Sequence, residues 1–261
     1  LLYNPQKGNI PYTLPKEAKE ILPSAPLNRM LHRYWRSTSI VGQLKTEGVE
    51  LYHGLSNELP KGINKTGIKA VVTIHDLIFK HFPENYKPID VKIYDFKSKQ
   101  ACELANKIIA ISEQTKKDIV EFYNINPNKI DVVYQGCSDL YKKECSSAHK
   151  DEVQQKYNLP AQFILNVGTI EKRKNILTVI ESLPKLPEAH LVIVGGKHKD
   201  YFQKLTNTIA ELKLNNRVHF LSNVSDKDLA ALYQMATAFI YPSVYEGFGI
   251  PIVEALYSKT P

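Results

Sequence analysis

Short apolar runs rich in β-branched residues recur along the chain and alternate with longer amphipathic stretches. Residues 113–123 place Ile119, Val120 and Tyr123 on one helical face, and residues 226–236 carry apolar side chains at the same helical spacing. Strands that alternate with helices indicate parallel sheets, so we predict an α/β fold. The expected strands are the runs AVVTI, KIIAIS, KIDVVY, FILNVGT, HLVIVGG, RVHFLS and AFIYPS.

A polar stretch without periodicity, residues 142–151, separates two such series of strands and helices. We place a domain boundary there, which gives domains 1–146 and 147–261. In folds of this class the ligand sits beyond the carboxyl ends of the strands. The chain begins without methionine and stops directly after an expected helix, so we expect both domains to be truncated at the chain ends.

The composition is typical of a globular protein, with 43% hydrophobic and 23% charged residues among 261. No apolar run reaches the roughly 18 to 20 residues of a membrane-spanning helix, and no secretory signal opens the chain, so we expect a cytoplasmic protein. Its three cysteines lack metal-ligand spacing and are expected to be reduced. The excess of 34 Lys and Arg over 27 Asp and Glu predicts an anionic partner: nucleic acid, a phosphorylated small molecule or an acidic membrane face.

The segment after the run AFIYPS has the marks of a loop followed by a helix that begins at Pro251. Gly247 and Gly249 let the loop backbone approach a ligand, and the helix amino terminus offers N–H groups to an anion. Glu246 is then a candidate for binding sugar hydroxyls and Glu254 for binding a ribose. Alternatively, the glycines only form a turn and Glu254 only complements the helix dipole. The complete string EGFGIPIVE favours the binding site.

The segment PSVYEGFGIPIVEALYSKTP resembles the signature PS-x-x-EGFG-x-P-x-x-EA of the retaining glycosyltransferases called family 4, with Lys259 where glycine is usual. The resemblance extends from about His53 to Pro261. It implies the GT-B fold, two Rossmann-like domains facing a cleft, with 1–146 on the acceptor side and 147–261 binding a nucleoside diphosphate sugar. The residues expected at the donor are Gly168, Thr169, Gly247, Phe248, Gly249, Ile250 and Glu254.

A basic cluster follows the run FILNVGT. Arg173 and Lys174 precede a helix predicted from about Asn175, and fixed positive charge there would stabilise the charge that develops on a leaving nucleoside diphosphate. A solvated helix start has the same composition. In the family an arginine follows the strand glycine, where Thr169 stands here, and a lysine lies where Lys174 stands. We predict that Lys174 contacts the diphosphate and infer that Arg173 supplies the missing guanidinium.

His75 comes directly after the run AVVTI, at the carboxyl end of a predicted strand, and is followed by Asp76. A lone His-Asp pair is usually turn or capping chemistry. Similar enzymes carry a histidine here near the anomeric carbon of the donor, and this resemblance favours a catalytic His75. The catalytic candidates are His75, Glu246, Lys174 and Arg173. The candidates for acceptor binding, in a loop after another predicted strand, are His53, Gly54 and Asn57.

Asp226 and Asp228 spell the metal motif of a different glycosyltransferase architecture, but Ser225 makes helix capping the better interpretation. No other acidic or histidine cluster is visible in the sequence, so we predict no metal and no cofactor. The diphosphate would instead be neutralised by Arg173, Lys174 and backbone amides.

Residues 29–37, RMLHRYWRS, interleave basic and aromatic side chains. This pattern is typical equally of a peripheral contact with an anionic membrane, or with a lipid-linked acceptor, and of an ordinary solvated helix. No nucleic-acid recognition motif accompanies it, so we predict no nucleic-acid partner.

Together with the resemblance, these residues predict a retaining, metal-independent hexosyltransferase of bacterial polysaccharide biosynthesis. The run RKN and the loop IHDLIF look most like mannosyltransferases, which makes GDP-mannose the first donor and a glycan or lipid-linked molecule the acceptor. UDP-linked sugars remain open, as does a non-catalytic homologue that only binds a nucleotide sugar. We expect front-face transfer with the leaving phosphate as base, because no carboxylate is clearly placed as a nucleophile.

Overall fold

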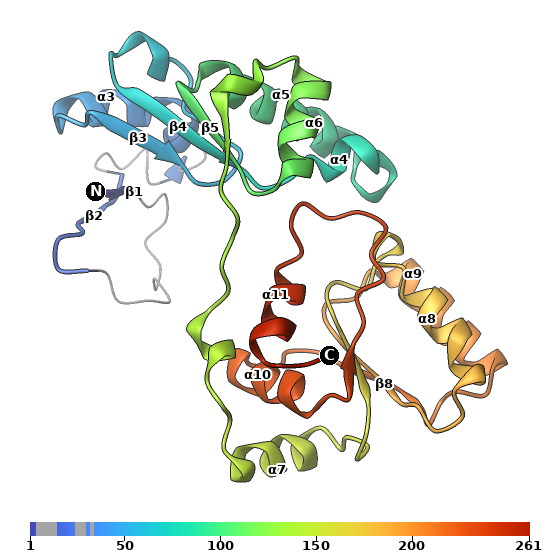
Figure 1. Ribbon diagram of the computed structural model, residues 1–261. Coiled ribbons are helices and arrows are strands. Elements are labelled where there is room, and N and C mark those ends of the chain that lie inside the picture. The colour runs from blue at the N-terminus through green and yellow to red at the C-terminus, as the bar shows by residue number, and fades with distance from the viewer. Residues whose placement is uncertain (4–14, 24–29, 32–33) are drawn as a thin grey trace. The chain divides into compact units, whose positions relative to one another are not determined.

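The computed structural model describes residues 1–3, 15–23, 30–31 and 34–261, which form two compact units, Leu1–Tyr134 and Gln135–Pro261 (Figure 1). Each unit contains a parallel four-stranded sheet with helices, which confirms the predicted α/β fold. The segment 135–146 belongs to the second unit, ahead of the predicted boundary. There Tyr141 is buried in that unit's core, and the Cys145 amide donates a hydrogen bond to the Gln234 side chain (2.9 Å).

The first unit is built on four parallel strands in the order β3 (Leu51–Gly54), β4 (Lys69–Ile74), β5 (Lys107–Ala110) and β6 (Ile130–Val132). Its helices are α3 (Ile40–Thr46), α4 (Ile78–His81), α5 (Pro88–Leu104) and α6 (Glu113–Tyr123). Helix α5 packs on β4, and α6 packs on β5 and β6. A separate parallel pair consists of β1 (Leu2–Tyr3) and β2 (Glu20–Ile21).

Helix α6 spans the residues that the amphipathic pattern predicted, and both of its ends have a physical cause. Ser112 caps the start by accepting a hydrogen bond from the Thr115 amide (3.0 Å). Asn124 ends the helix in the left-handed conformation, with a φ of 53°. The buried side chains Ile119 and Tyr123 then face the core of the first unit.

The second unit is built on a parallel sheet in the order β10 (Ala238–Phe239), β7 (Ile164–Val167), β8 (Leu191–Val194) and β9 (Val218–Leu221). Its helices are α7 (Ser147–Lys156), α8 (Ile176–Ser182), α9 (Lys199–Glu211), α10 (Asp226–Met235) and α11 (Ile250–Tyr257). The short helices of the chain are the π-helical η1 (Trp35–Ser39) and the 3₁₀ turns η2 (Ile63–Lys65), η3 (Pro83–Asn85), η4 (Pro127–Lys129), η5 (Asp139–Lys142), η6 (Lys172–Lys174) and η7 (Leu183–Lys185).

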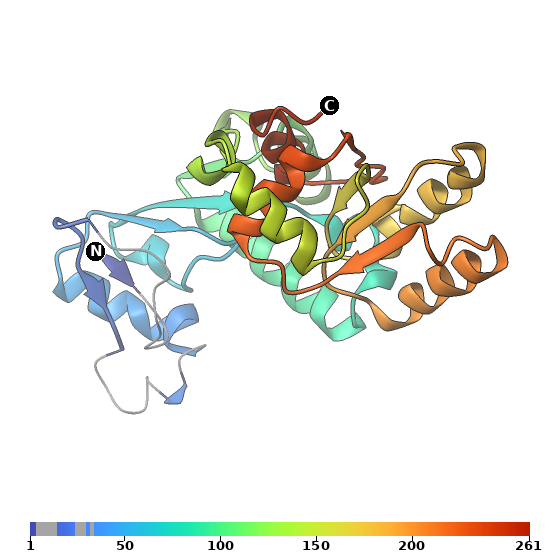
Figure 2. The ribbon, with the colours of Figure 1, turned by 90° about the horizontal axis from the view of Figure 1, so that it is seen from below.

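Strand β8 shows why the second unit has three layers. All four of its residues are buried, as expected for a central parallel strand. Leu191 and Ile193 pack with the side chains of α8 and α9, whereas Val192 and Val194 pack with those of α7, α10 and α11. Helices therefore cover both faces of the sheet, and in Figure 2 the strands of this unit lie between the two groups of helices.

No helix among the residues that the structure describes is both long enough and apolar enough to cross a membrane.

Lys259 stands where the family signature has glycine, and its backbone conformation is one that favours glycine. Lys259 follows α11 with a φ of 60°, in the left-handed region that favours glycine. We therefore expect Lys259→Gly to stabilise the protein by about 0.5 to 1 kcal/mol, because relief of backbone strain exceeds the entropy gained by the unfolded chain. The check is the denaturant midpoint. Lys204→Gly, at an exposed interior position of α9, should instead destabilise by about 1 kcal/mol.

Candidate functional site

The basic cluster and the glycine-rich loop meet in the second unit because β7 and β10 are neighbouring parallel strands. Gly168 follows β7, and the loop of residues 240–249 follows β10, so both leave the same edge of the sheet. The Asn166 side chain joins the two by donating a hydrogen bond to the Ile240 carbonyl (2.8 Å), and the Val244 amide donates to the Arg173 carbonyl (2.9 Å). Residues about 70 positions apart in sequence thus form one surface.

Glu246 lies at the centre of this surface and is paired with both predicted cations. Its Oε1 is 2.5 Å from Lys174 Nζ, and its Oε2 is 2.8 Å from Arg173 Nη1. Lys174 also donates a hydrogen bond to the Tyr241 hydroxyl (2.9 Å). An ammonium group has three N–H donors, and these two partners use two of them. One donor of Lys174 can therefore serve a further anion.

Arg173 differs from Lys174 because its guanidinium is enclosed by protein. Its side chain is 8% exposed and is bound by Glu171 Oε1 (2.5 Å), the Tyr245 carbonyl (2.6 Å) and Glu246. These contacts fix the loop that carries Glu246. The sequence did not single out Glu171 or Tyr241, since each reveals its part only when the two loops meet.

The charges around Glu246 determine its ionisation. Burial by itself would raise the pKa of the Glu246 carboxyl, but the hydrogen bond from Lys174 and the charges of Lys174 and Arg173 outweigh it, and the pKa lies below the ordinary value. Glu246 is therefore an anion at neutral pH. An ionised carboxylate accepts hydrogen bonds and cannot act as a proton donor.

The other residues predicted at the donor lie around this surface. Gly249 has a φ of 92° and precedes α11, which begins one residue before the predicted Pro251, at Ile250. Any other residue at this φ would be strained. Gly168 lies beside the Lys174 side chain, and Thr169 is exposed next to it. Gly247 is buried, whereas Phe248 and Ile250 are half-buried.

Glu254 lies one helical turn into α11 and is half-buried. Its Oε2 accepts a hydrogen bond from the Tyr233 hydroxyl (2.9 Å), which reaches it from α10. Burial raises the pKa of the Glu254 carboxyl above its ordinary value, although hydrogen bonds from Tyr233 and Tyr141 act in the opposite direction. Ionisation of Glu254 therefore destabilises the folded protein.

This destabilisation predicts a stability effect that depends on pH. Because the folded-state pKa of Glu254 is raised, its contribution to stability is fully present below the unfolded value of about 4.5 and is lost as pH rises through the folded value. Glutamine imitates the protonated acid. We therefore expect Glu254→Gln to have a higher melting temperature than the wild type at pH 7 and an equal one near pH 4. A constant difference at both pH values would contradict this.

In the first unit, His75 follows β4 directly, as predicted, and its position is fixed by residues of the preceding loop. Its Nε2 is 2.8 Å from the Leu55 carbonyl, so Nε2 carries the proton, because a carbonyl only accepts. Its backbone amide donates to Asn57 Oδ1 (2.8 Å), and the Asn57 Nδ2 donates to the Asp76 carbonyl (3.2 Å). Asp76 also caps the next turn by accepting from the Ile78 amide (3.1 Å). Asn57 therefore positions the His-Asp turn.

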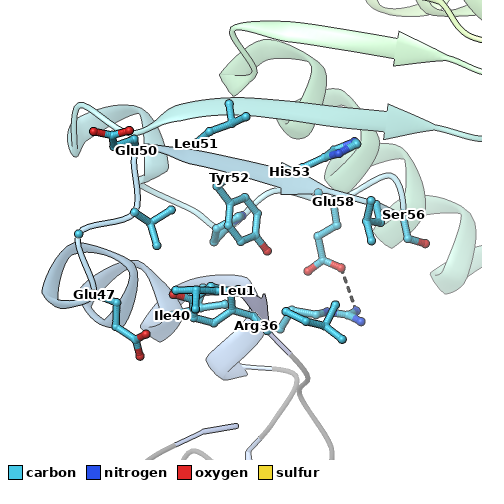
Figure 3. A pocket seen from close by; sticks show the side chains of 17 residues that line it. Leu1, Arg36, Ile40, Glu47, Glu50, Leu51, Tyr52, His53, Ser56 and Glu58 are labelled. Carbon is cyan, nitrogen blue, oxygen red and sulfur yellow. Dashed lines mark hydrogen bonds and ion pairs between the residues drawn. The ribbon is translucent and has the colours of Figure 1, made fainter. Parts of the chain in front are cut away.

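The predicted acceptor residues divide between two cavities of the first unit. Asn57 and His75 line one of about 410 Å³, which also contains the rings of Phe79, Tyr86 and Tyr94. His53 and Gly54 line another of about 700 Å³, shown in Figure 3.

His53 and Gly54 lie in β3 itself and not in the loop after it, which corrects the prediction. His53 Nε2 is 2.8 Å from Thr73 Oγ1 on the neighbouring strand. At Gly54 a Cβ atom would lie 2.2 Å from the Glu58 carbonyl, so glycine is required for the chain to fold back. Gly54 therefore has a structural role, and acceptor binding by His53 stays a prediction.

The two cavities share a charged group that the sequence did not indicate. Glu58 accepts hydrogen bonds from Ser37 (2.7 Å), Arg36 (2.9 Å) and Lys97 (3.2 Å), and Figure 3 shows its ion pair with Arg36. Burial opposes ionisation, but these donors hold the pKa of the Glu58 carboxyl below its usual value.

Two other predicted features have structural explanations. Ser225 caps α10 by accepting from the Asp228 amide (3.2 Å), and the Asp228 carboxylate pairs with Lys156 (2.7 Å), which confirms capping. Within the described ranges no group of three or more His, Cys, Asp or Glu is arranged to hold a metal ion.

Of the stretch 29–37, residues 29, 32 and 33 lie outside the described residues. Trp35 is buried in the core of the first unit, so its ring is not part of a membrane-facing or solvated surface. Met30 and Tyr34 are exposed.

The chain resembles known proteins over nearly its whole length. Residues 10–139 match the family model "Glycosyltransferase Family 4", and residues 149–261 match "Glycosyl transferases group 1". The O-antigen chain mannosyltransferase RfbU of Salmonella typhimurium is 28% identical over 236 residues, 90% of this chain and 61% of that protein. O-antigen chain mannosyltransferase B of Escherichia coli is 33% identical over 217 residues, 81% of this chain and 55% of that protein. The chain thus spans less than two thirds of these relatives.

Solved structures agree on the fold. A glycosyltransferase from Rickettsia africae is 22% identical, with a TM-score of 0.67 over 92% of this chain and 64% of that one. HepE of Anabaena, solved with UDP and glucose, is 19% identical, with a TM-score of 0.66 over 93% of this chain and 65% of that one. Two parallel-sheet units, the two matched family models and these neighbours together show that the chain belongs to the family 4 (group 1) glycosyltransferases with the GT-B fold.

Proposed function

We propose that this chain is the greater part of a retaining glycosyltransferase that moves mannose from GDP-mannose to a glycan or lipid-linked acceptor in bacterial polysaccharide biosynthesis. The observation that carries this proposal is the cluster of Glu246, Lys174 and Arg173 on one edge of the second unit's sheet, within a family 4 glycosyltransferase sequence. The choice of mannose is supported by the two O-antigen mannosyltransferase relatives. UDP-linked sugars are the alternative donors.

The proposed mechanism gives each residue a separate task. Lys174 donates its third N–H to the diphosphate and stabilises the charge that develops on the leaving group. Glu246, an anion, accepts hydrogen bonds from the sugar hydroxyls, and Glu254 accepts them from the ribose. Arg173 is bound by three protein partners, which favours a role in holding Glu246 over direct contact with phosphate.

His75 is proposed to orient the sugar near its anomeric carbon, and the leaving phosphate to take the proton of the acceptor hydroxyl. No metal and no cofactor enters this scheme. A cytoplasmic location, peripheral at the inner face of the membrane, remains part of the proposal.

The experiment is transfer from labelled GDP-mannose to total lipid-linked and soluble glycan acceptors, with the anomeric configuration of the product read by NMR. We expect an α-linked product, which is retention. An inverted product would overturn the mechanism.

Thr169, standing where the family has arginine, favours one second candidate, a homologue that binds a nucleotide sugar without catalysis. Binding of the donor with no detectable transfer and no donor hydrolysis would establish that candidate.

A further inference from the structure

Tyr233 makes a contact at the proposed ribose site that the family signature does not include. It lies in α10, is 0% exposed, and donates its hydroxyl hydrogen bond to Glu254 Oε2 across the interface with α11 (2.9 Å). A buried phenol hydroxyl needs an acceptor, and a carboxylate is the strongest that a side chain offers. The bond therefore joins a fully buried group to a half-buried one.

The surroundings of Tyr233 leave its ring little freedom. Tyr141 packs edge-on against it, with ring centroids 5.7 Å apart, and Phe239 lies at 5.4 Å. Thr260 Oγ1 donates to the Tyr233 carbonyl (2.7 Å), which ties the chain after α11 back to α10. Residues of η5, β10 and the chain after α11 thus hold Tyr233 in place.

We propose that Tyr233 is a positioning residue for the donor nucleotide: it holds Oε2 of Glu254 so that the remaining acceptor sites of the carboxylate receive the ribose hydroxyls. This inference rests on the proposed function, because it requires a ribonucleotide at Glu254. A glutamate side chain has three rotatable bonds, and one fixed in advance loses less freedom when the ligand binds. The gain appears in nucleotide affinity and depends on the ribose hydroxyls.

If Tyr233 has only a structural role, a different binding result is expected. If the hydroxyl only stabilised the packing of α10 on α11, its removal would weaken binding of every nucleotide to the same extent or of none. Binding of a ribonucleotide and of its 2′,3′-dideoxy form therefore separates the two roles. The dideoxy form keeps the base and the diphosphate but has no hydroxyl for Glu254.

The experiment uses isothermal titration of the whole chain with GDP, UDP and ADP, and with the 2′,3′-dideoxy form of the one that binds. The variant is Tyr233→Phe, which removes a single oxygen. The matched control is Tyr157→Phe, which also removes a phenol bond to a carboxylate, Asp228 Oδ2 (2.9 Å), but does not contact Glu254. Thermal unfolding of each variant checks that it is folded.

We expect Tyr233→Phe to weaken binding of the ribonucleotide about threefold to tenfold, which is a fraction of the effect of one hydrogen bond to a charged group. Binding of the dideoxy form should change less than about twofold. In a Glu254→Gln background the same substitution should add nothing. Tyr157→Phe should leave both affinities unchanged.

Equal weakening of both nucleotides by Tyr233→Phe, or no change in either, would overturn the positioning role while leaving the proposed function intact. If the wild type binds none of the three nucleoside diphosphates, the proposed function itself fails. Should Tyr233→Phe not fold, Glu254→Gln supplies the test: a wild-type preference for the ribonucleotide that survives in this variant contradicts the inference.

Discussion

Replacing Glu246 with glutamine is expected to lower kcat for sugar transfer about 100-fold to 1,000-fold, the range seen when one preorganised polar contact to a transition state is lost. The amide keeps the shape of the side chain but not its charge. Lys174 and Arg173 then lose the anion that now binds both of them. The measurement is single-turnover transfer from GDP-mannose, with the melting temperature read in parallel.

Glu171→Gln is the matched control for this substitution, because Glu171 is the other carboxylate bound to Arg173 (2.5 Å). It removes the same charge from the same guanidinium, and the mechanism gives it no contact with the sugar. Its kcat should fall less than about fivefold, since only the support of Arg173 is weakened. Comparable losses in the two variants would show that Glu246 acts only by holding Arg173.

As a separate variant, Lys174→Met is expected to lower kcat for sugar transfer about 100-fold or more. The reason is that the leaving diphosphate would lose a fixed cation in the transition state. Methionine preserves most of the volume of the aliphatic stem. Affinity for the nucleoside diphosphate should also fall, since this product carries the charge that Lys174 is proposed to bind. Steady-state kinetics and titration with GDP measure the two effects.

Lys172→Met provides the control for charge alone. Lys172 lies in the same 3₁₀ turn and is exposed, whereas the Lys174 side chain is 12% exposed. A long-range electrostatic effect on an exposed site is screened by salt, so this variant should bind GDP nearly as the wild type does at about 0.15 M salt. If both variants lost affinity equally, the cluster would act only through its net charge.

The alternation of strands and helices was readable in the sequence because both sheets are parallel and buried. The runs AVVTI and HLVIVGG became β4 and β8, and the 113–123 pattern became α6 without a change of bounds. The loop and helix of EGFGIPIVE were predicted from Pro251 and the glycines before it, and the helix indeed begins there, at Ile250. The positive φ of Gly249 is an additional reason for glycine at that position.

Pairings between distant loops could not be predicted. Arg173 was expected to replace a missing guanidinium at the phosphate, but its burial and its bonds to Glu171 and Tyr245 depend on how two loops pack. The same holds for Tyr233, whose helical spacing predicted a core residue and could not indicate that its hydroxyl reaches Glu254. Trp35 was misread for a different reason. The basic and aromatic pattern of residues 29–37 predicted a surface segment, but Trp35 is buried in the core.

We propose that the second unit binds a nucleoside diphosphate sugar through Glu246, Lys174 and Glu254. A thermal-shift series with GDP-mannose, UDP-glucose, UDP-N-acetylglucosamine and ADP-glucose tests it most directly, because a ligand at about 100 times its Kd stabilises the native state by about 2.7 kcal/mol. We expect GDP-mannose to raise the melting temperature of the wild type by several degrees and that of Lys174→Met and Glu246→Gln much less. No shift of the wild type with any of the four nucleotide sugars, or a shift in both variants as large as that of the wild type, would contradict this proposal.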